Sequence, residues 1–295
     1  MKNYIISFLL MTILFSCSNR EKVVDKDKLL GKDYRLFQAT PAWSLAKAVW
    51  DEDLIQIQKL VKQKGNEVNY QEPKYGKTLL MLTILNEQYK SCEKLLELGA
   101  DPNKHDRYDG SSAIIDAAAI NGTSDDNTAF LNLLLKNGAN PNDIEVGKRR
   151  NDNLGRATPL IKACSSINKI VSPLARVKIL VEAGADINYI GEYYQSPLSC
   201  ALLAENFDII VYFLQRDINC KIPIFTRNEK IFYIQDVLRE EVLPLDSKEY
   251  QQKLEIVKLL KQKGIDYKIV PIPDFIIKRV KKIYSKNWED YLSKY

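Results

Sequence analysis

Residues 76–103 read GKTLLMLTILNEQYKSCEKLLELGADPN, and this stretch decides how the rest of the chain is interpreted. It holds two apolar runs of helical spacing. Thr78 stands where its side chain can accept a hydrogen bond from a backbone N–H and so cap the first helix. Gly99 follows the second run and lets the chain leave that helix through a left-handed conformation. Because Asp101 and Asn103 favour a turn, the stretch predicts two short helices followed by a turn.

This order of features resembles an ankyrin repeat, in which Gly-x-Thr-Pro-Leu-His opens one helix and Leu-Leu-x-x-Gly-Ala-Asp-x-Asn closes a second. The distance from Thr78 to Asn103 is 25 residues (103 − 78), which is the spacing of that family. Other copies open at Ser112, Thr158 and Ser196. The closing asparagines lie at positions 69, 103, 142, 188 and 219, so the steps between them are 34, 39, 46 and 31 residues. One repeat cannot bury its own apolar face, so several copies in register favour a stack.

The resemblance implies an all-α fold, an ankyrin-repeat solenoid of about six repeats with short hairpin fingers and a C-terminal capping helix. We expect a signal peptide at 1–16, a lipidated N-terminus and tether at 17–39, and repeats over 40–267. The individual repeats are predicted at 40–69, 70–103, 104–142, 143–188, 189–219 and 220–267, followed by the capping helix at 268–295. The sixth repeat is degenerate, with helices expected near Ile231–Glu241 and Glu249–Gln262.

The tail carries an apolar stripe (Ile277, Val280, Tyr284, Trp288 and Tyr291) with basic residues on its other faces. Two interpretations of this helix remain. As a cap, its stripe packs on repeat six, and we favour this because terminal solenoid repeats need a cover. As a membrane-surface helix, its basic residues would meet anionic lipid.

The N-terminus has one early basic residue, Lys2, and then an apolar run from Tyr4 to Phe15. This run is too short to span a bilayer but is typical of a secretory signal. Its end, Leu14-Phe15-Ser16-Cys17, resembles a bacterial lipobox, although Phe15 departs from the small or β-branched residue usual there. The resemblance implies lipidation of Cys17 and a membrane-anchored lipoprotein of the bacterial cell envelope, facing the periplasm or in the outer membrane. The alternative is an ordinary cleaved signal, which the absence of an Ala-x-Ala site disfavours.

Charge and motifs argue against several classes of function. The net charge is +5, about +4 once Lys2 leaves with the signal peptide, and the basic residues form no single stripe, so we expect no nucleic-acid partner. The only histidine, His105, has no cysteine or second histidine at ligand spacing, which excludes a zinc site of the usual kind. The sequence has no Gly-rich phosphate loop and no hydrolase or metalloprotease motif. We therefore predict no catalytic residue, no metal and no cofactor, and do not expect an enzyme.

The remaining cysteines are read as part of the repeat pattern. Cys92 and Cys164 fall on apolar positions and are predicted to be buried. In an exported protein a Cys164–Cys200 bridge between adjacent repeats can form, while Cys220 lies just past Asn219. The histidine of the family pattern is replaced here, so we expect apolar packing rather than hydrogen bonds to hold the neighbouring loops; its positions hold Met81, Ile115, Ile161 and Ser199.

Ankyrin stacks bind other proteins through finger tips and the concave faces of their first helices, and the resemblance implies the same use here. Tyr and Arg are the side chains most enriched at binding hot spots. The candidate protein-binding residues are Tyr70, Lys74, Tyr75, Lys104, His105, Arg107, Tyr108, Lys148, Arg149, Arg150, Tyr189, Tyr193 and Tyr194. The alternative for each tyrosine is packing against the neighbouring finger.

The sequence thus predicts a monomeric, lipid-anchored module that binds another protein. A narrower alternative is an immunity-type inhibitor of an envelope toxin or enzyme, which the mildly basic mature chain disfavours, since many such inhibitors are acidic. A less favoured alternative is an envelope enzyme whose unrecognised site lies in the C-terminal region.

Overall fold

The computed structural model describes residues 20–63, 67–119, 128–147, 155–167 and 172–295 of the 295-residue chain. The chain divides into two compact units, and each is described by itself. Unit 1 comprises Met1–Ala117, Asn132–Asn140 and Glu145–Lys148, and unit 2 comprises Ala118–Leu131, Pro141–Ile144 and Arg149–Tyr295. The expected signal peptide and Cys17 lie outside the described residues.

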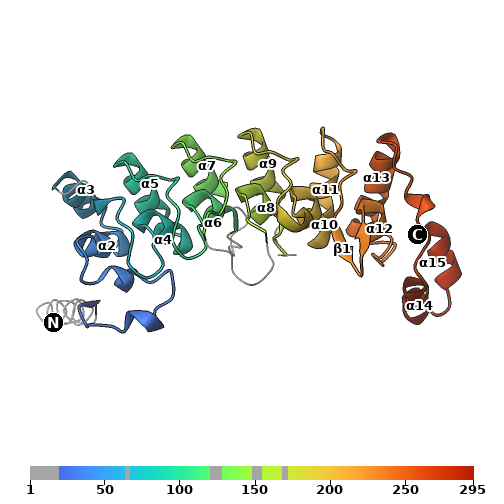
Figure 1. Cartoon of the computed structure of the whole chain (residues 1–295), viewed down its shortest axis with the longest axis horizontal. Helices are drawn as coiled ribbons and strands as arrows, with labels where there is room; N and C mark the ends of the chain where they lie inside the picture. The colour runs from blue at the N-terminus through green and yellow to red at the C-terminus, as the bar shows by residue number, and fades with distance from the viewer. Residues whose placement is uncertain (1–19, 64–66, 120–127, 148–154, 168–171) are drawn as a thin grey trace, which may run out of the picture. The chain divides into compact units, whose positions relative to one another are not determined.

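Unit 1 is built from helix pairs that form two rows (Figure 1). The first helix of repeat one packs on the first helix of repeat two, and the second helices pack likewise. These helices are α2 (Trp43–Trp50), α3 (Leu54–Gln63), α4 (Leu79–Leu85) and α5 (Tyr89–Glu97). The helices of the third repeat, α6 (Ala113–Ala119) and α7 (Thr128–Lys136), contribute residues to both units.

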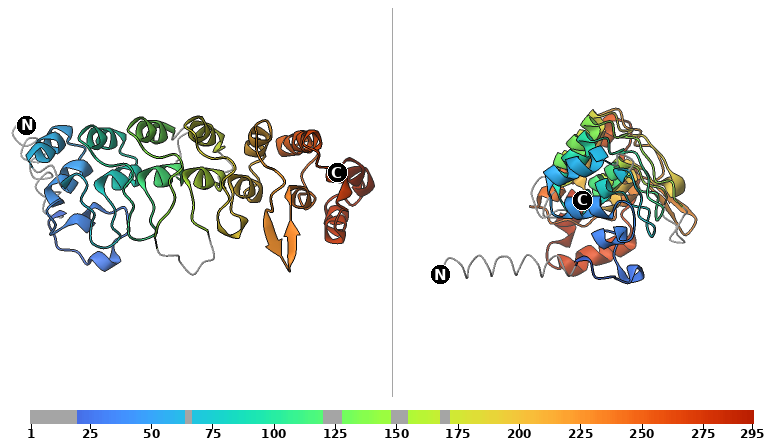
Figure 2. Two further views of the ribbon diagram at one scale, coloured as in Figure 1. Left: turned by 45° about the horizontal axis from the view of Figure 1, so that its top comes forward. Right: turned by 90° about the vertical axis from the view of Figure 1, so that its left-hand side faces the viewer.

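Unit 2 continues the same alternation of short helices. Its pairs are α8 (Pro159–Cys164) with α9 (Leu174–Glu182), α10 (Pro197–Leu203) with α11 (Phe207–Leu214), and α12 (Ile234–Leu238) with α13 (Lys248–Gln262). The first helices α8, α10 and α12 pack in sequence, as do the second helices α9, α11 and α13. Figure 2 shows the loops between repeats leaving the helices on one side; these loops are the fingers of the ankyrin pattern.

The ends of the helices follow from local chemistry. Thr78, Thr158 and Ser196 each accept a hydrogen bond from the backbone N–H three residues later, which starts α4, α8 and α10. Gly99 ends the second helix of its repeat with a φ of +89°, a conformation that a Cβ would strain although the space beside it is empty.

Leu134 tests the packing register of the repeats. It is fully buried, as are the equivalent Leu95 and Leu180. We expect Leu134→Ala to lower the free energy of unfolding by about 2–5 kcal/mol, because it removes apolar contacts and leaves a cavity. Urea denaturation followed by circular dichroism measures this. Ile55→Ala is the control, since Ile55 is 83% exposed; equal midpoints for the two variants would place Leu134 at the surface.

Within each unit, a ladder of asparagines joins consecutive repeats. In unit 1 the Asn69 amide donates to the Gly99 carbonyl (3.1 Å) and accepts from the Asp101 N–H (2.8 Å). Asn103 bonds in the same way to Gly138 (2.9 Å) and Asn140 (2.9 Å). In unit 2 the equivalent residues are Asn142, which bonds to Gly184 and Asp186, and Asn188, which bonds to Asp217 and Asn219. The closing asparagine is therefore more than a turn former, because it cross-links consecutive repeats.

The ladder predicts a graded effect at Asn103. Asn103→Ala removes both of its inter-repeat hydrogen bonds and should destabilise the protein by about 1–2 kcal/mol. Asn103→Asp keeps an oxygen to accept from the Asn140 N–H but loses the donor to Gly138, so a smaller loss is expected. Thermal denaturation of the parent and the two variants measures these losses. An alanine variant as stable as the parent would contradict the role of Asn103 as a cross-link.

The segment before the first repeat differs from the expected tether. It forms two 3-10 turns, η1 (Lys26–Lys28) and η2 (Tyr34–Phe37), and buries Tyr34, Leu36 and Phe37. The ring of Tyr34 stacks on that of Trp50 with centroids 5.8 Å apart. These apolar side chains cover part of repeat one, where they pack on α2 and beside Tyr70, and the Tyr34 hydroxyl donates to the Gln88 side chain of repeat two. The segment is rich in charged residues, and for this reason its composition predicted a tether rather than packing on the repeats.

Repeat six also differs from expectation. Instead of a helix beginning near Ile231, residues Phe225–Arg227 (β1) and Lys230–Phe232 (β2) pair as an antiparallel hairpin. Phe225 and Phe232 stack across it with ring centroids 4.8 Å apart. The helix starts only at Ile234, because the Asp236 carboxylate accepts the backbone N–H of Tyr233 and caps it there.

The structure divides the expected C-terminal helix into two, α14 (Asp274–Ile283) and α15 (Trp288–Lys294). The chain turns between them, and the rings of Tyr284 and Tyr291 stack at 4.4 Å. Tyr291 also donates a hydrogen bond from its hydroxyl to the Leu243 carbonyl (2.8 Å) and so joins the helix pair to repeat six. The two helices cap that repeat, as predicted, through a cluster that buries Ile276 rather than Ile277.

Candidate functional site

Several candidate residues in unit 1 hold the fingers together. The Lys74 ammonium donates to the carbonyls of Lys26 (3.0 Å) and Asp27 (2.8 Å), and the Tyr75 hydroxyl donates to that of Leu29 (2.9 Å). The Arg107 guanidinium donates to the Glu72 carbonyl (2.8 Å). These side chains bind the N-terminal segment and the neighbouring finger, so their hydrogen-bonding groups are already used inside unit 1.

The other unit 1 candidates divide between packing and exposure. Tyr70 is half-buried beside Phe37, with ring centroids 6.3 Å apart. The His105 ring contacts the Gly110 carbonyl through Nδ1 (2.7 Å). Lys104 is half-buried, whereas Tyr108 is 52% exposed. Tyr108 is therefore the aromatic candidate in unit 1 that is most open to a partner.

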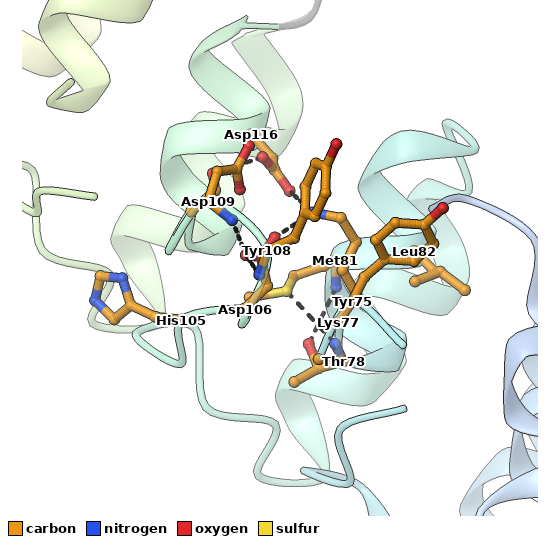
Figure 3. Close-up of polar contacts among 12 residues, drawn as sticks. Tyr75, Lys77, Thr78, Met81, Leu82, His105, Asp106, Tyr108, Asp109 and Asp116 are labelled. Carbon is orange, nitrogen blue, oxygen red and sulfur yellow. Dashed lines mark hydrogen bonds and ion pairs between the residues drawn. The ribbon is translucent and has the colours of Figure 1, made fainter. Parts of the chain in front are cut away.

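A buried charge cluster supports Tyr108 from below (Figure 3). The Lys77 ammonium lies 2.5 Å from Asp106 Oδ2 and 3.4 Å from Asp116 Oδ2, and the Asp106 side chain is fully buried. Asp106 Oδ1 accepts the backbone N–H groups of Tyr108, Asp109 and Gly110, each at 3.0 Å. The cluster thus fixes the tip of this finger. The sequence pattern had treated position 77 as free to vary.

The charged groups of this cluster shift one another's pKa values. Burial alone would lower the pKa of Lys77, but the carboxylates of Asp116 and Asp106 outweigh it and raise the pKa above 10.5. Burial alone would raise the pKa of Asp106, but Lys77 and the finger N–H groups bring it below 3.8. Lys77 and Asp106 therefore form an ion pair at neutral pH.

In unit 2 the finger before α10 presents two adjacent tyrosines. Tyr193 and Tyr194 are 59% and 38% exposed, and both have positive φ angles, +55° and +61°. Such backbone conformations cost on the order of 1 kcal/mol each for residues with a Cβ. The Ser199 hydroxyl donates to the Tyr194 carbonyl (3.0 Å) and holds the finger in place. At this repeat a hydrogen bond therefore supports the loop, contrary to our expectation of apolar packing alone.

Tyr193 forms one wall of an apolar groove of about 330 Å³ in unit 2. Leu203, at the end of α10, and Ile167 line it and are 58% and 75% exposed. Ile224 and Phe225, at the start of the β1–β2 hairpin, close the other side. The groove therefore lies between two fingers and against a first helix. Its polar lining comes from Gly155, Ser165, Glu192, Gln195 and Ser199.

Cys200 also lines the groove. Burial raises the pKa of its thiol above 9.0, so it stays protonated at neutral pH and is a poor nucleophile. Cys92, Cys164, Cys200 and Cys220 are all free, so the bridge considered between Cys164 and Cys200 is not formed. As predicted, Cys92 and Cys164 are buried. Cys200 therefore adds an uncharged side chain to the mostly apolar lining of the groove.

The sequence interpretation included one side of this groove and missed the other. Tyr193 was a candidate, and Tyr189 and Tyr194 lie on the same finger, Tyr189 half-buried. Leu203 and Ile167 were missed. A signal was present, because residues 197–203 are apolar except for Ser199, whereas packing on one side uses only part of a helix. Lys148, Arg149 and Arg150 lie outside the described residues.

The described part of the chain contains no group of three or more His, Cys, Asp or Glu side chains arranged to hold a metal ion. Within that same part, no helix combines the length and apolar character needed to cross a bilayer.

The chain matches no family model, and a search of curated proteins finds no match. It is similar in fold to solved structures. One is the crystal structure of an ankyrin repeat domain from Acinetobacter baumannii AYE, with a TM-score of 0.55 and 20% sequence identity. The similarity covers 75% of this chain and 97% of that chain. The prediction of an all-α ankyrin-repeat solenoid is thereby confirmed.

Proposed function

We propose that this ankyrin-repeat chain is a lipid-anchored module of the bacterial envelope that binds another protein through the groove of unit 2. The observation that carries the proposal is the exposure of Leu203, Ile167 and Tyr193 around one groove. Contiguous exposed apolar surface is costly in water and typically marks an interaction site. Tyr193 supplies the rigid aromatic contact that is common at the energetic centre of interfaces.

The shape of the groove favours a partner segment that inserts an apolar side chain. A volume of about 330 Å³ is at the lower end of the range for binding pockets. The strained tyrosine finger and the hairpin stand on either side of it. Because repeat stacks are rigid scaffolds whose exposed residues choose the partner, binding needs no rearrangement of the helices. Nothing in this mode of binding calls for catalysis or a cofactor.

Partner recovery tests the groove. We expect a specific partner to be recovered from detergent-solubilised membranes with the parent chain and lost with Leu203→Glu, which places a charge on the apolar wall. Tyr193→Ala should weaken the complex by about 2 kcal/mol, or roughly 30-fold, if it is a hot spot. Ile55→Glu places the same charge on an exposed isoleucine of α3 and should leave recovery unchanged. Equal recovery with all three variants would refute the groove as the binding site.

The anchor is supported by the sequence Leu14-Phe15-Ser16-Cys17 and by the apolar run before it. A thiol at the new N-terminus is needed for the thioether to the lipid. Two or three acyl chains hold a protein firmly on a membrane, whereas one is marginal. Mass spectrometry of the mature protein should find acyl groups on Cys17 and none in Cys17→Ser. A mature N-terminus without acyl groups would remove the anchor and leave the groove as the whole of the function.

A further inference from the structure

Helix α14 has two unlike faces. One face buries Ile276 and Val280 in the cluster that docks the C-terminal helices on repeat six. The opposite face carries Phe275, Lys278, Arg279 and Lys282, which follow at positions i, i+3, i+4 and i+7 and therefore share one side of the helix. We call these four residues the cationic face. All four are exposed.

Most of the charge of this face is unpaired within the described part of the chain, although the Arg279 guanidinium acts on the Glu241 carboxylate and opposes the rise in its pKa that burial causes. None of its three basic residues takes part in the ion pairs found among the described residues. Residues 268–295 contain seven basic and three acidic side chains, a net charge of +4 (7 − 3). Lys286, in the turn after α14, is exposed and adds to the same region.

Apolar side chains accompany the charges. Phe275 is 52% exposed in the first turn of α14, and Ile283 is 53% exposed at its last residue. Neither is needed for the docking of the helix, whose buried residues are Ile276 and Val280. A surface that combines lysine and arginine with exposed aromatic and aliphatic groups is suited to a boundary between water and lipid.

We propose that the cationic face of α14 binds the surface of an anionic lipid membrane. Each basic side chain near such a surface contributes on the order of 1 kcal/mol at physiological ionic strength, and the attraction decays within a Debye length. Phe275, which shares the cationic face, then reaches into the headgroup region. The contact is made by side chains that already point outward, so the packing of α14 on repeat six does not change.

A lipid surface fits this face better than an acidic protein segment does. Segments of proteins are usually held in grooves, and none of the described cavities of unit 2 is lined by Phe275, Lys278, Arg279 or Lys282. The cationic face lies on the exposed, convex side of a single helix, so it can contact a flat charged surface such as a membrane. The inference does not depend on the groove, and it uses the proposed anchor at Cys17 only as a reason for a membrane to be nearby.

Lysine footprinting tests the proposal on the full chain. The protein is reconstituted with vesicles of neutral phosphatidylcholine, or of phosphatidylcholine with about one third phosphatidylglycerol, and acetylated with an amine-reactive reagent. We expect labelling of Lys278, Lys282 and Lys286 to fall about fivefold or more with the anionic vesicles only, and to recover in about 0.5 M salt. Lys59 and Lys62, exposed on α3, should label equally in both.

Charge-matched variants make the result specific. K278Q/R279Q/K282Q should abolish the protection of Lys286, whereas K59Q/K62Q/K90Q, which removes the same charge from exposed lysines elsewhere, should retain it. Protection that persists in the Cys17→Ser chain shows that the face acts even where the proposed anchor is absent. Equal labelling with neutral and anionic vesicles, or protection by polyglutamate but not by anionic vesicles, would overturn the proposal.

Discussion

Lys77→Met is expected to lower the free energy of unfolding by about 3–5 kcal/mol, because it removes the cation from a buried charge cluster. Asp106 would then keep its charge in a fully buried site without the ammonium that lies 2.5 Å away. Removing one partner of a buried pair is far more costly than the net worth of the pair, since the remaining charge stays desolvated. Urea unfolding at neutral pH measures the loss.

A lysine in a partly exposed ion pair supplies the control. Lys94 is paired with Glu97 one turn along α5, where the Glu97 side chain is 54% exposed. Lys94→Met should cost less than about 1 kcal/mol, because exposed ion pairs contribute little. If Lys77→Met were no more destabilising than Lys94→Met, the cluster would not stabilise the finger.

The Lys77 cluster also has a defined pH range. Because the pKa of Lys77 is raised in the folded state, its contribution is fully present below 10.5 and is lost as the pH rises through the raised value. The pKa of Asp106 is lowered, so its contribution is present above 3.8 and is lost as the pH falls through the lowered value. Comparing Lys77→Met with the parent should therefore show the largest difference between these limits.

A second lysine should behave in the opposite way. Lys253 of α13 is 2% exposed and donates to the Glu241 carbonyl (3.0 Å), with its ammonium 3.8 Å from the centroid of the Tyr295 ring. Burial lowers its pKa to about 7, with the Glu241 carboxylate opposing the shift and Arg239 adding to it. A shift from 10.5 to about 7 corresponds to about 5 kcal/mol of penalty on the charged form.

The sign of the pH dependence follows from proton binding. Between about pH 7 and pH 10.5 the unfolded chain holds a proton on Lys253 that the folded chain has released, so this group makes stability rise with pH. We expect a gain of roughly 2 kcal/mol between pH 7 and pH 8.5 in the parent. Lys253→Met should lack this gain and should be more stable than the parent at pH 6 by about 3–5 kcal/mol.

Denaturation midpoints across this pH range test the prediction. Lys258→Met is the matched control, since Lys258 lies on the same helix with its side chain 67% exposed. The buried cysteines make the free energy of unfolding fall with pH near pH 9, which opposes the effect of Lys253. Subtracting the profile of one variant from that of another removes this cysteine contribution. Parallel pH profiles for the parent and Lys253→Met would show that Lys253 is not a buried, destabilised cation.

The sequence predicted some residues of the candidate site and not others. Tyr193 and Tyr194 were identified from their place in a finger, and the structure exposes both. Lys74 and Tyr75 were identified by the same rule, but the structure uses them to bind the N-terminal segment. Leu203 was passed over because an apolar residue on a helix is ordinarily taken as core. Position in a repeat therefore indicates which side chains can point outward, but not which of them stay uncovered.

The amino-acid sequence by itself determined the repeating helix pairs, their caps at Thr78, Thr158 and Ser196, and the burial of Leu95, Leu134 and Leu180. The helices and caps depend on interactions between residues close together in the chain. The buried leucines pack on neighbouring repeats but hold the same place in every repeat, so spacing identifies both. The partners of Asn103, the cover provided by Tyr34 and Phe37, and the groove beside Leu203 were decided only by the tertiary structure. They join residues from different repeats or from segments that do not repeat, so no local spacing encodes them.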